Sequence, residues 1–80
     1  MYKTISVSKK NIKEGRRKKP YACPIALACK DAGLYDPSVG DYYMVLTGKI
    51  VDTPNTVHRF IQNFDAGKPV KPFKFRINLK

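Results

Sequence analysis

The sequence predicts one small α+β domain spanning residues 1–80, because segments with the two-residue period of strands alternate with segments of helical period. Eighty residues suffice for a single modest core. The composition, 42% hydrophobic with five Tyr and four Phe, is typical of a globular chain and not of a disordered one. The predicted order is βαββαβ, which is the ferredoxin-like order and places four strands in one sheet with two helices.

The N-terminal residues predict a strand followed by a short helical turn. Residues 2–7 alternate apolar and polar side chains and are rich in β-branched residues, as strands are. The candidates for the buried face of this strand are Tyr2, Ile5 and Val7. Ser8 is a suitable cap for a turn of helix over residues 9–14, which Gly15 ends. Four consecutive cations at 16–19 predict a loop, because like charges do not pack.

A buried helix is predicted from Pro24 to Ala32. Proline is favoured at the first helical position, and Gly33 supplies a stop. The apolar face expected from the helical period consists of Ile25, Ala28, Cys29 and Ala32. Because Ala26 and Leu27 are also apolar, we expect this helix to be buried on most sides. Residues 34–41 contain a proline and a glycine and predict a connecting loop.

The second half predicts a hairpin, a helix and a final strand. Residues 42–47 and 49–52 have strand composition and flank Gly48, so we expect them to pair. Thr53 and Pro54 then predict a hydroxyl cap and the first position of a helix ending near residue 65. Its predicted buried face is Val57, Phe60, Ile61 and Phe64, and the inward residues of the final strand are Phe73, Phe75, Ile77 and Leu79.

The strongest compositional signal is the net charge of +10. Residues 1–30 carry a net +8 and residues 66–80 a net +5, whereas residues 31–65 carry a net −3. If the two ends of the chain lie side by side, they form one strongly basic face. No apolar run is long enough for a membrane span and no secretory leader is evident, so we expect a soluble intracellular protein.

Catalytic and metal chemistry find little support in the sequence. His58 is the only histidine and points sideways or outward from the predicted helix, so a surface histidine is the simpler interpretation. Five residues separate Cys23 from Cys29, which is wider than zinc-knuckle spacing, and we expect reduced thiols packed in the core. No paired carboxylates or phosphate-binding glycine loop occurs. We therefore expect no enzymatic activity, no metal and no cofactor.

The segment 9–19 holds seven cations in eleven residues and is the candidate functional site. Such a loop costs stability through repulsion unless an anion binds to it; a solvated surface that only aids solubility is the alternative. The predicted nucleic-acid contacts are Lys9, Lys10, Lys13, Arg16, Arg17, Lys18, Lys19, Tyr21, Lys74, Arg76 and Lys80. Tyr42 and Tyr43 are candidates for stacking on a base, although in a strand one of the two should face inward.

The chain resembles a group of small uncharacterised bacteriophage and prophage proteins. The motifs that carry the resemblance are Ile5-Ser6-Val7 followed by a turn ending at Gly15, the helix Cys23-Pro24-Ile25-Ala26-Leu27-Ala28, and the close Phe64-Asp65-Ala66-Gly67-Lys68-Pro69-Val70-Lys71-Pro72-Phe73. These motifs span nearly the whole chain but are structural in kind. The resemblance implies a phage origin, action in the cytoplasm of the bacterial host, and a role in modifying that host. The basic loop departs from the pattern.

Two functions follow as expectations. The first is a non-enzymatic nucleic-acid-binding protein that contacts phosphates through the basic loop and the C-terminal strand. The alternative is a protein-binding inhibitor of a host or defence complex, an anti-CRISPR being one form, that docks on an acidic surface. The sequence distinguishes neither DNA from RNA nor one oligomeric state from another.

Overall fold

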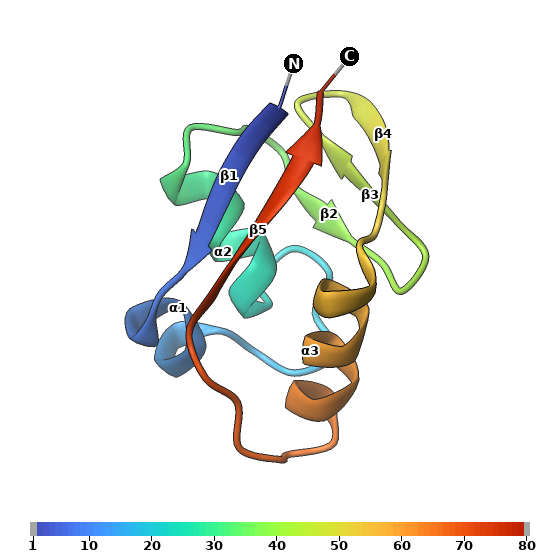
Figure 1. Cartoon of the computed structure of the whole chain (residues 1–80). Coiled ribbons are helices and arrows are strands. Elements are labelled where there is room, and N and C mark those ends of the chain that lie inside the picture. Colours follow the sequence, from blue (N-terminus) through green and yellow to red (C-terminus); the bar gives the residue numbers. More distant parts are fainter. Residues whose placement is uncertain (1, 80) are drawn as a thin grey trace.

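The computed structural model describes residues 2–79 and shows a small α+β fold (Figure 1). Its elements are β1 (Tyr2–Val7), α1 (Lys9–Glu14), α2 (Pro24–Asp31), β2 (Ser38–Val39), β3 (Tyr43–Leu46), β4 (Lys49–Asp52), α3 (Asn55–Asp65) and β5 (Phe73–Asn78). Within the described residues, no helix has the length and apolar character that crossing a bilayer requires.

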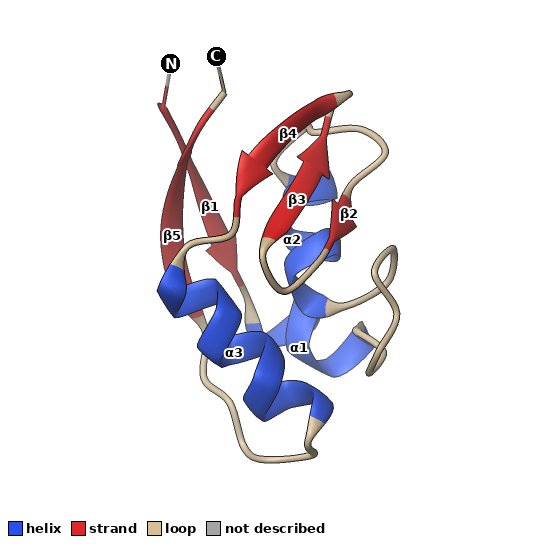
Figure 2. Ribbon diagram, turned by 90° about the vertical axis from the view of Figure 1, so that its right-hand side faces the viewer, coloured by secondary structure: helices blue, strands red, loops and turns tan. Residues whose placement is uncertain are grey.

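The strands form two separate sheets, so the predicted four-stranded sheet is wrong. β1 pairs antiparallel with β5, from Tyr2 opposite Asn78 to Val7 opposite Phe73. β3 lies between β2 and β4 in a three-stranded antiparallel sheet. Figure 2 shows the two sheets apart from each other, with α2 behind β2 and β3. The pairing of β1 with β5 thus meets the condition stated for a single basic face, that the two ends lie side by side, without joining these strands to the central hairpin.

Each sheet turns one face toward a shared core. The inward residues are Ile5 and Val7 of β1, Phe75 and Ile77 of β5, and Met44 and Leu46 of β3. From the helices they meet Ile25, Ala26, Ala28 and Cys29 of α2 and Val57, Phe60 and Ile61 of α3. The Phe60 ring lies 5.0 Å from that of Phe73, centroid to centroid, so aromatic packing joins α3 to β5.

The hairpin formed as predicted with Gly48 in its turn, but Thr47, which was predicted in the strand, also lies in the turn, in a conformation that β-branched residues rarely adopt. Thr47 and Gly48 both have positive φ, of 49° and 77°, which is the geometry of a two-residue type I′ turn. Helix α2 also begins at Pro24 as predicted. Leu27 of α2 is only half-buried, however, so this helix is less enclosed than its composition indicated.

Several local expectations were wrong. Tyr2 is exposed, because inward positions in β1 alternate from Ile5 to Val7 and leave Tyr2 out of phase. The predicted loop at 34–41 contains the short strand β2. At the start of α3, Pro54 occupies the cap position with no side-chain hydrogen bond, and the Thr53 hydroxyl instead donates to the Gly40 carbonyl at 3.0 Å. Phe64, Phe73 and Leu79, by contrast, pack against the core as predicted, although each is only half-buried.

Candidate nucleic-acid interface

The three lysines of α1 project from a short helix that is fixed at its start. The Ser8 hydroxyl accepts a hydrogen bond from the Asn11 amide at 3.1 Å, and the Asn11 side-chain oxygen accepts one from the Ser8 amide at 2.9 Å. Asn11 is buried and its side-chain nitrogen donates to Asp31 of α2 at 2.9 Å. Lys9, Lys10 and Lys13 are exposed.

The positions of two of these lysines are unfavourable for the helix itself. Lys9 and Lys10 lie in the first turn of α1, which holds no acidic residue. A cation at a helix N-terminus opposes the helix dipole, at a cost on the order of 0.3–1 kcal/mol. The stability of α1 therefore does not explain their presence, whereas an anionic partner would offset that cost.

Of the predicted basic segment 9–19, residues 9–14 form α1 and only Arg16 to Lys19 form a loop, which we call the basic loop from here on. This loop is folded and held in place. The Arg16 amide donates to the Ala22 carbonyl at 2.8 Å, and the Lys18 amide donates to the Asp65 carboxylate of α3 at 2.9 Å. Just before the loop, a Cβ on Gly15 would lie 2.5 Å from the Pro24 ring, so no larger residue fits there. The four side chains are exposed, and we call Arg16, Arg17, Lys18 and Lys19 the loop cluster.

Strand β5 presents its cations on the outer face of the two-stranded sheet. Lys74 lies opposite Ser6 and Arg76 opposite Thr4, and both cations are exposed. The Arg76 guanidinium carbon lies 4.9 Å from the centre of the Tyr2 ring, in cation–π geometry. Lys80, the remaining predicted contact of this strand, lies outside the described residues. The described outward positions of β1 and β5 are Tyr2, Thr4, Ser6, Lys74, Arg76 and Asn78, and they include no carboxylate.

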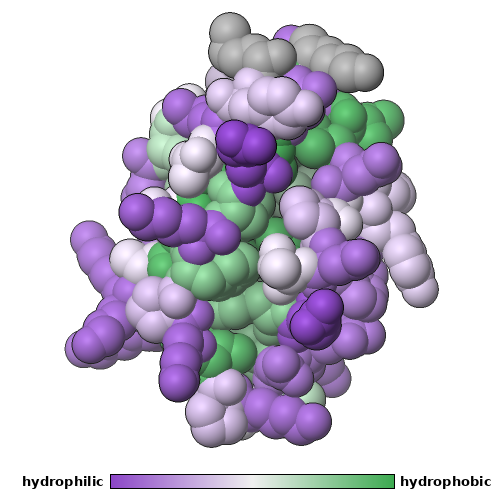
Figure 3. Space-filling model, viewed as in Figure 1, coloured by the Kyte–Doolittle hydropathy of each residue, from purple (hydrophilic) through white to green (hydrophobic). Residues whose placement is uncertain are grey.

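The beginning of α1 extends this surface. β1 ends beside the start of β5, where Val7 pairs with Phe73, and Lys9 and Lys10 follow two residues later. We call Lys9, Lys10, Lys74 and Arg76 the sheet cluster. Figure 3, which views this side of the molecule, shows hydrophilic side chains along both edges of the face around a narrower apolar strip.

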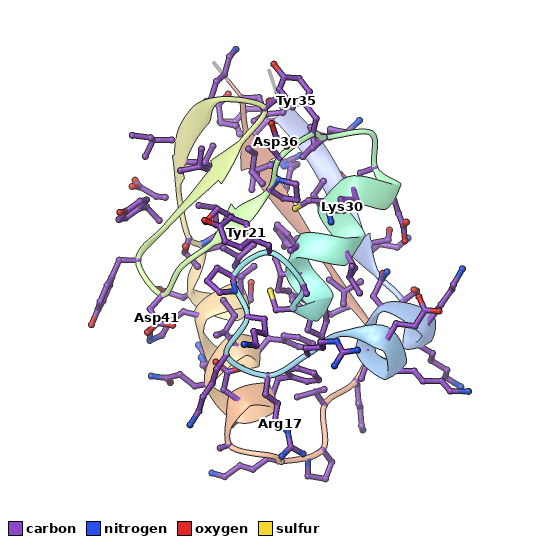
Figure 4. The ribbon with its side chains drawn as sticks, turned by 180° about the vertical axis from the view of Figure 1, so that it is seen from behind. Arg17, Tyr21, Lys30, Tyr35, Asp36 and Asp41 are labelled. Atoms are coloured by element: carbon purple, nitrogen blue, oxygen red, sulfur yellow. The ribbon has the colours of Figure 1, made fainter. Side chains whose placement is uncertain are left out.

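The structure does not bring the two clusters onto one face. Figure 1 shows β1 and β5 in front of the segment that follows α1, and Figure 2 shows β5 and that segment on opposite sides. Figure 4, from behind, shows Arg17 and Tyr21 on the far side. Tyr21 is exposed there beside β2, whose Val39 amide donates to the Pro20 carbonyl at 3.0 Å. The predicted contacts therefore form two basic surfaces joined by α1.

Both tyrosines of the predicted stacking pair are exposed, which corrects the expectation that one faces inward. Tyr43 is 57% and Tyr42 82% exposed. The inward alternation of β3 begins at Met44, and Tyr42 precedes the strand in a bend. The sequence could have shown this, since Met44 and Leu46 are the more apolar members of the segment.

The cysteines pack in the core, as predicted. Both are buried free thiols, and the Cys23 sulfur caps α2 by accepting a hydrogen bond from the Ala26 amide at 3.4 Å. Burial raises the pKa of the Cys23 thiol and raises that of Cys29 to about 12. Both thiols are therefore protonated at neutral pH, which disfavours nucleophilic attack and metal binding.

Chemical groups that often mark an active site do not converge here. The His58 Nδ1 lies 2.9 Å from the Asp41 carbonyl oxygen, and the ring stacks on Tyr42 at 5.8 Å. Among residues 2–79, no three His, Cys, Asp or Glu side chains gather into a group that could hold a metal. Comparisons with protein-family models, curated proteins and solved structures found no match to this chain.

Proposed function

We propose that the protein is a non-enzymatic, phage-encoded nucleic-acid-binding protein that acts in the cytoplasm of a bacterial host and contacts phosphates through its two basic clusters. The observation that carries the proposal is the outer face of β1 and β5, where exposed cations stand among hydroxyl groups and no carboxylate competes with a phosphate. Hydroxyls and cations are the usual donors to phosphate oxygens.

The side chains of this face also suit a nucleic acid better than a free anion. Tyr2 offers an exposed ring, and Arg76 lies over it, so a base can stack where phosphates are bound nearby. Backbone phosphates repeat along a strand, which matches a row of cations from α1 to Arg76. Sequence-independent binding follows, because phosphates carry no base identity.

The separation of the clusters favours a flexible strand. The described molecule measures 33 × 22 × 18 Å, so a single strand passing around α1 can reach both surfaces. A straight duplex contacts one surface at a time. We therefore expect single strands of about 20 nucleotides to bind more tightly than duplexes of equal length.

The experiment compares three double variants that each remove two exposed cations. Lys74→Ser with Arg76→Ser tests the sheet cluster, and Arg16→Ser with Lys19→Ser tests the loop cluster. Lys30→Ser with Arg59→Ser is the matched control, with the same change in net charge away from both. Binding to a fluorescent single strand and to a duplex is measured at salt concentrations from about 50 to about 300 mM. Over this range the fall of affinity with salt, which reports the release of counterions, can be measured.

Both test variants should weaken single-strand binding more than the control does, and flatten the slope of log affinity against log salt by roughly 0.7–0.9 per lost phosphate contact. If all three variants lose affinity equally, binding reflects net charge alone and the assigned surfaces are wrong. If the native protein shows no affinity near 50 mM salt, the nucleic-acid proposal fails and the protein-binding alternative takes its place.

A further inference from the structure

The surface away from β1 and β5 has a different character. Each described tyrosine is more than half exposed, although tyrosine usually buries most of its ring. Four of them, Tyr21, Tyr35, Tyr42 and Tyr43, surround β2 and β3. Figure 4 shows Tyr21 and Tyr35 on this side together with Asp36 and Asp41. Exposed tyrosines of this kind are enriched where proteins bind one another.

Two depressions adjoin in this surface. A hollow of about 290 Å³ lies between Pro20 and the start of β3, where Asp41, Tyr42 and Tyr43 line it. A cavity of about 200 Å³ lies next to it under the basic loop, lined mainly by Ile25, Val39, Phe60, Ile61 and Phe64. Pro20, Val39, Gly40 and Asp41 line both, so the two depressions are adjacent, and we call them together the groove.

The hollow is held in its shape before anything binds. The Gly40 amide donates to the Tyr43 carbonyl at 3.0 Å, and the Thr53 hydroxyl donates to the Gly40 carbonyl at 3.0 Å. His58 contacts the Asp41 carbonyl and stacks on Tyr42, fixing the bend between β2 and β3. A preformed site loses little conformational entropy on binding.

The charge of the hollow selects its occupant. Asp41, Tyr42 and Tyr43 line the hollow together, and Asp36 lies on the same side of the molecule. Phosphates are repelled by such a site, whereas a guanidinium pairs with the carboxylate and lies on an aromatic face. The opposite end of the groove is bordered by Lys18 and Lys19 together with Asp65, whose carboxylate accepts a hydrogen bond from the Lys18 amide, so the tyrosine rings mark the hollow as the end that suits a guanidinium.

We propose that this groove binds an extended segment of a partner protein, with an arginine side chain in the hollow at Asp41–Tyr43 and an apolar side chain in the adjoining cavity. An apolar cavity of about 150 Å³ holds a benzene molecule, so the larger cavity accepts a leucine or phenylalanine side chain. The groove thus gives the protein a second binding surface, independent of its basic clusters.

The probe is the peptide acetyl-Ala-Phe-Arg-Ala-amide, titrated into the ¹⁵N-labelled protein while backbone amide shifts are followed. We expect shifts confined to residues 39–43 and to the part of α3 that lines the cavity. Replacing arginine by glutamate, or phenylalanine by glycine, in the peptide should each weaken binding. Equal binding of the glutamate peptide, or shifts centred on β1 and β5, would overturn the proposal.

Substitutions in the protein supply the second arm. Asp41→Asn and Tyr42→Ser each change an exposed side chain and should weaken peptide binding about threefold. Their matched controls, Asp36→Asn and Tyr35→Ser, lie outside the lining of the hollow and should bind as the native protein does. Asp41→Asn and its control Asp36→Asn should not reduce nucleic-acid affinity, because neither carboxylate belongs to the basic clusters. Saturable shifts of Tyr42 and Tyr43 with oligo(dT), and none with the peptide, would instead assign the hollow to a base.

Discussion

Among single residues, the buried thiol of Cys29 has the clearest physical consequence. Burial raises its pKa to about 12 from the 9.0 of an exposed thiol, with a smaller contribution from the nearby Cys23. A group whose pKa is higher in the folded than in the unfolded protein favours folding below the unfolded value. That contribution is lost as the pH rises from about 9 toward about 12.

We therefore expect the free energy of unfolding to fall with pH above about 9, and to fall less steeply in a Cys29→Ala variant that has no thiol there. Urea titrations at several pH values measure both slopes. The comparison with the variant separates Cys29 from the lysines and tyrosines that titrate in the same range. Identical slopes would show that this thiol is not buried as described.

Phe60 is the residue on which the attachment of α3 depends. It is 7% exposed and contacts the rings of Phe64 and Phe73, at 6.1 and 5.0 Å between centroids. Phe60→Ala should lower the free energy of unfolding by about 3–5 kcal/mol, which is most of the stability of a small domain. Gln62→Ala, at an exposed position of the same helix, is the control. A midpoint of thermal unfolding that barely moves would contradict this packing.

Among the elements, α1 owes its stability mainly to the side chain of Asn11 and not to its own length. Six residues are too few for a stable isolated helix, and Asn11 supplies both its cap contact and its bond to Asp31. Asn11→Ala should destabilise the protein by about 1–3 kcal/mol and speed hydrogen exchange in α1 more than in α2. Glu14→Ala is the exposed control. Uniform exchange rates in the variant would show that α1 does not open separately.

Some elements could be predicted from the sequence and others could not. Strict alternation in β5 and the apolar period of α3 set their buried faces, because the side-chain periods of strand and helix differ. Strand pairing is not contained in that pattern: β4 fits a hairpin with β3 whether or not its other edge pairs with β5. The two-residue strand β2 is formed by backbone hydrogen bonds to β3, and the identities of its side chains do not predict such bonds.

The candidate site was predictable in composition but not in arrangement. The exposure of the cations follows from their charge, because Lys and Arg side chains are almost never fully buried without a partner. That Arg16–Lys19 lies behind β5 depends on Lys18 binding Asp65 of α3, a contact between distant positions that no local pattern shows. The groove at Asp41–Tyr43 was missed because Tyr42 and Tyr43 were assigned to a strand with one side inward.

At the scale of the whole molecule, the net charge of +10 acts against folding. The Debye length is about 30 Å at 0.01 M salt and about 8 Å at 0.15 M, and the longest dimension is 33 Å. Repulsion therefore spans the protein only at low salt.

We expect the thermal midpoint to rise as NaCl increases from about 0.01 to 0.15 M, the range over which screening shortens from the size of the molecule to that of a side chain. A variant with serine at all four loop-cluster positions should have a higher thermal midpoint at low salt, and its midpoint should rise less as salt is added, because the variant carries less positive charge. Scanning calorimetry of both proteins tests this. A midpoint that falls with salt would show that attraction outweighs repulsion.

The pairing of β1 with β5 has a consequence for how the chain folds. β1 is made before β5, and all the other described helices and strands lie between these two partners in the chain. During synthesis, Ile5 and Val7 therefore remain without β5 until those elements have been added. A contact between such distant positions also slows the search for the native state, since the loop that it closes contains all the described elements between β1 and β5. The two-stranded sheet therefore forms in one late step, and the loss of either strand leaves the other without its pairing partner.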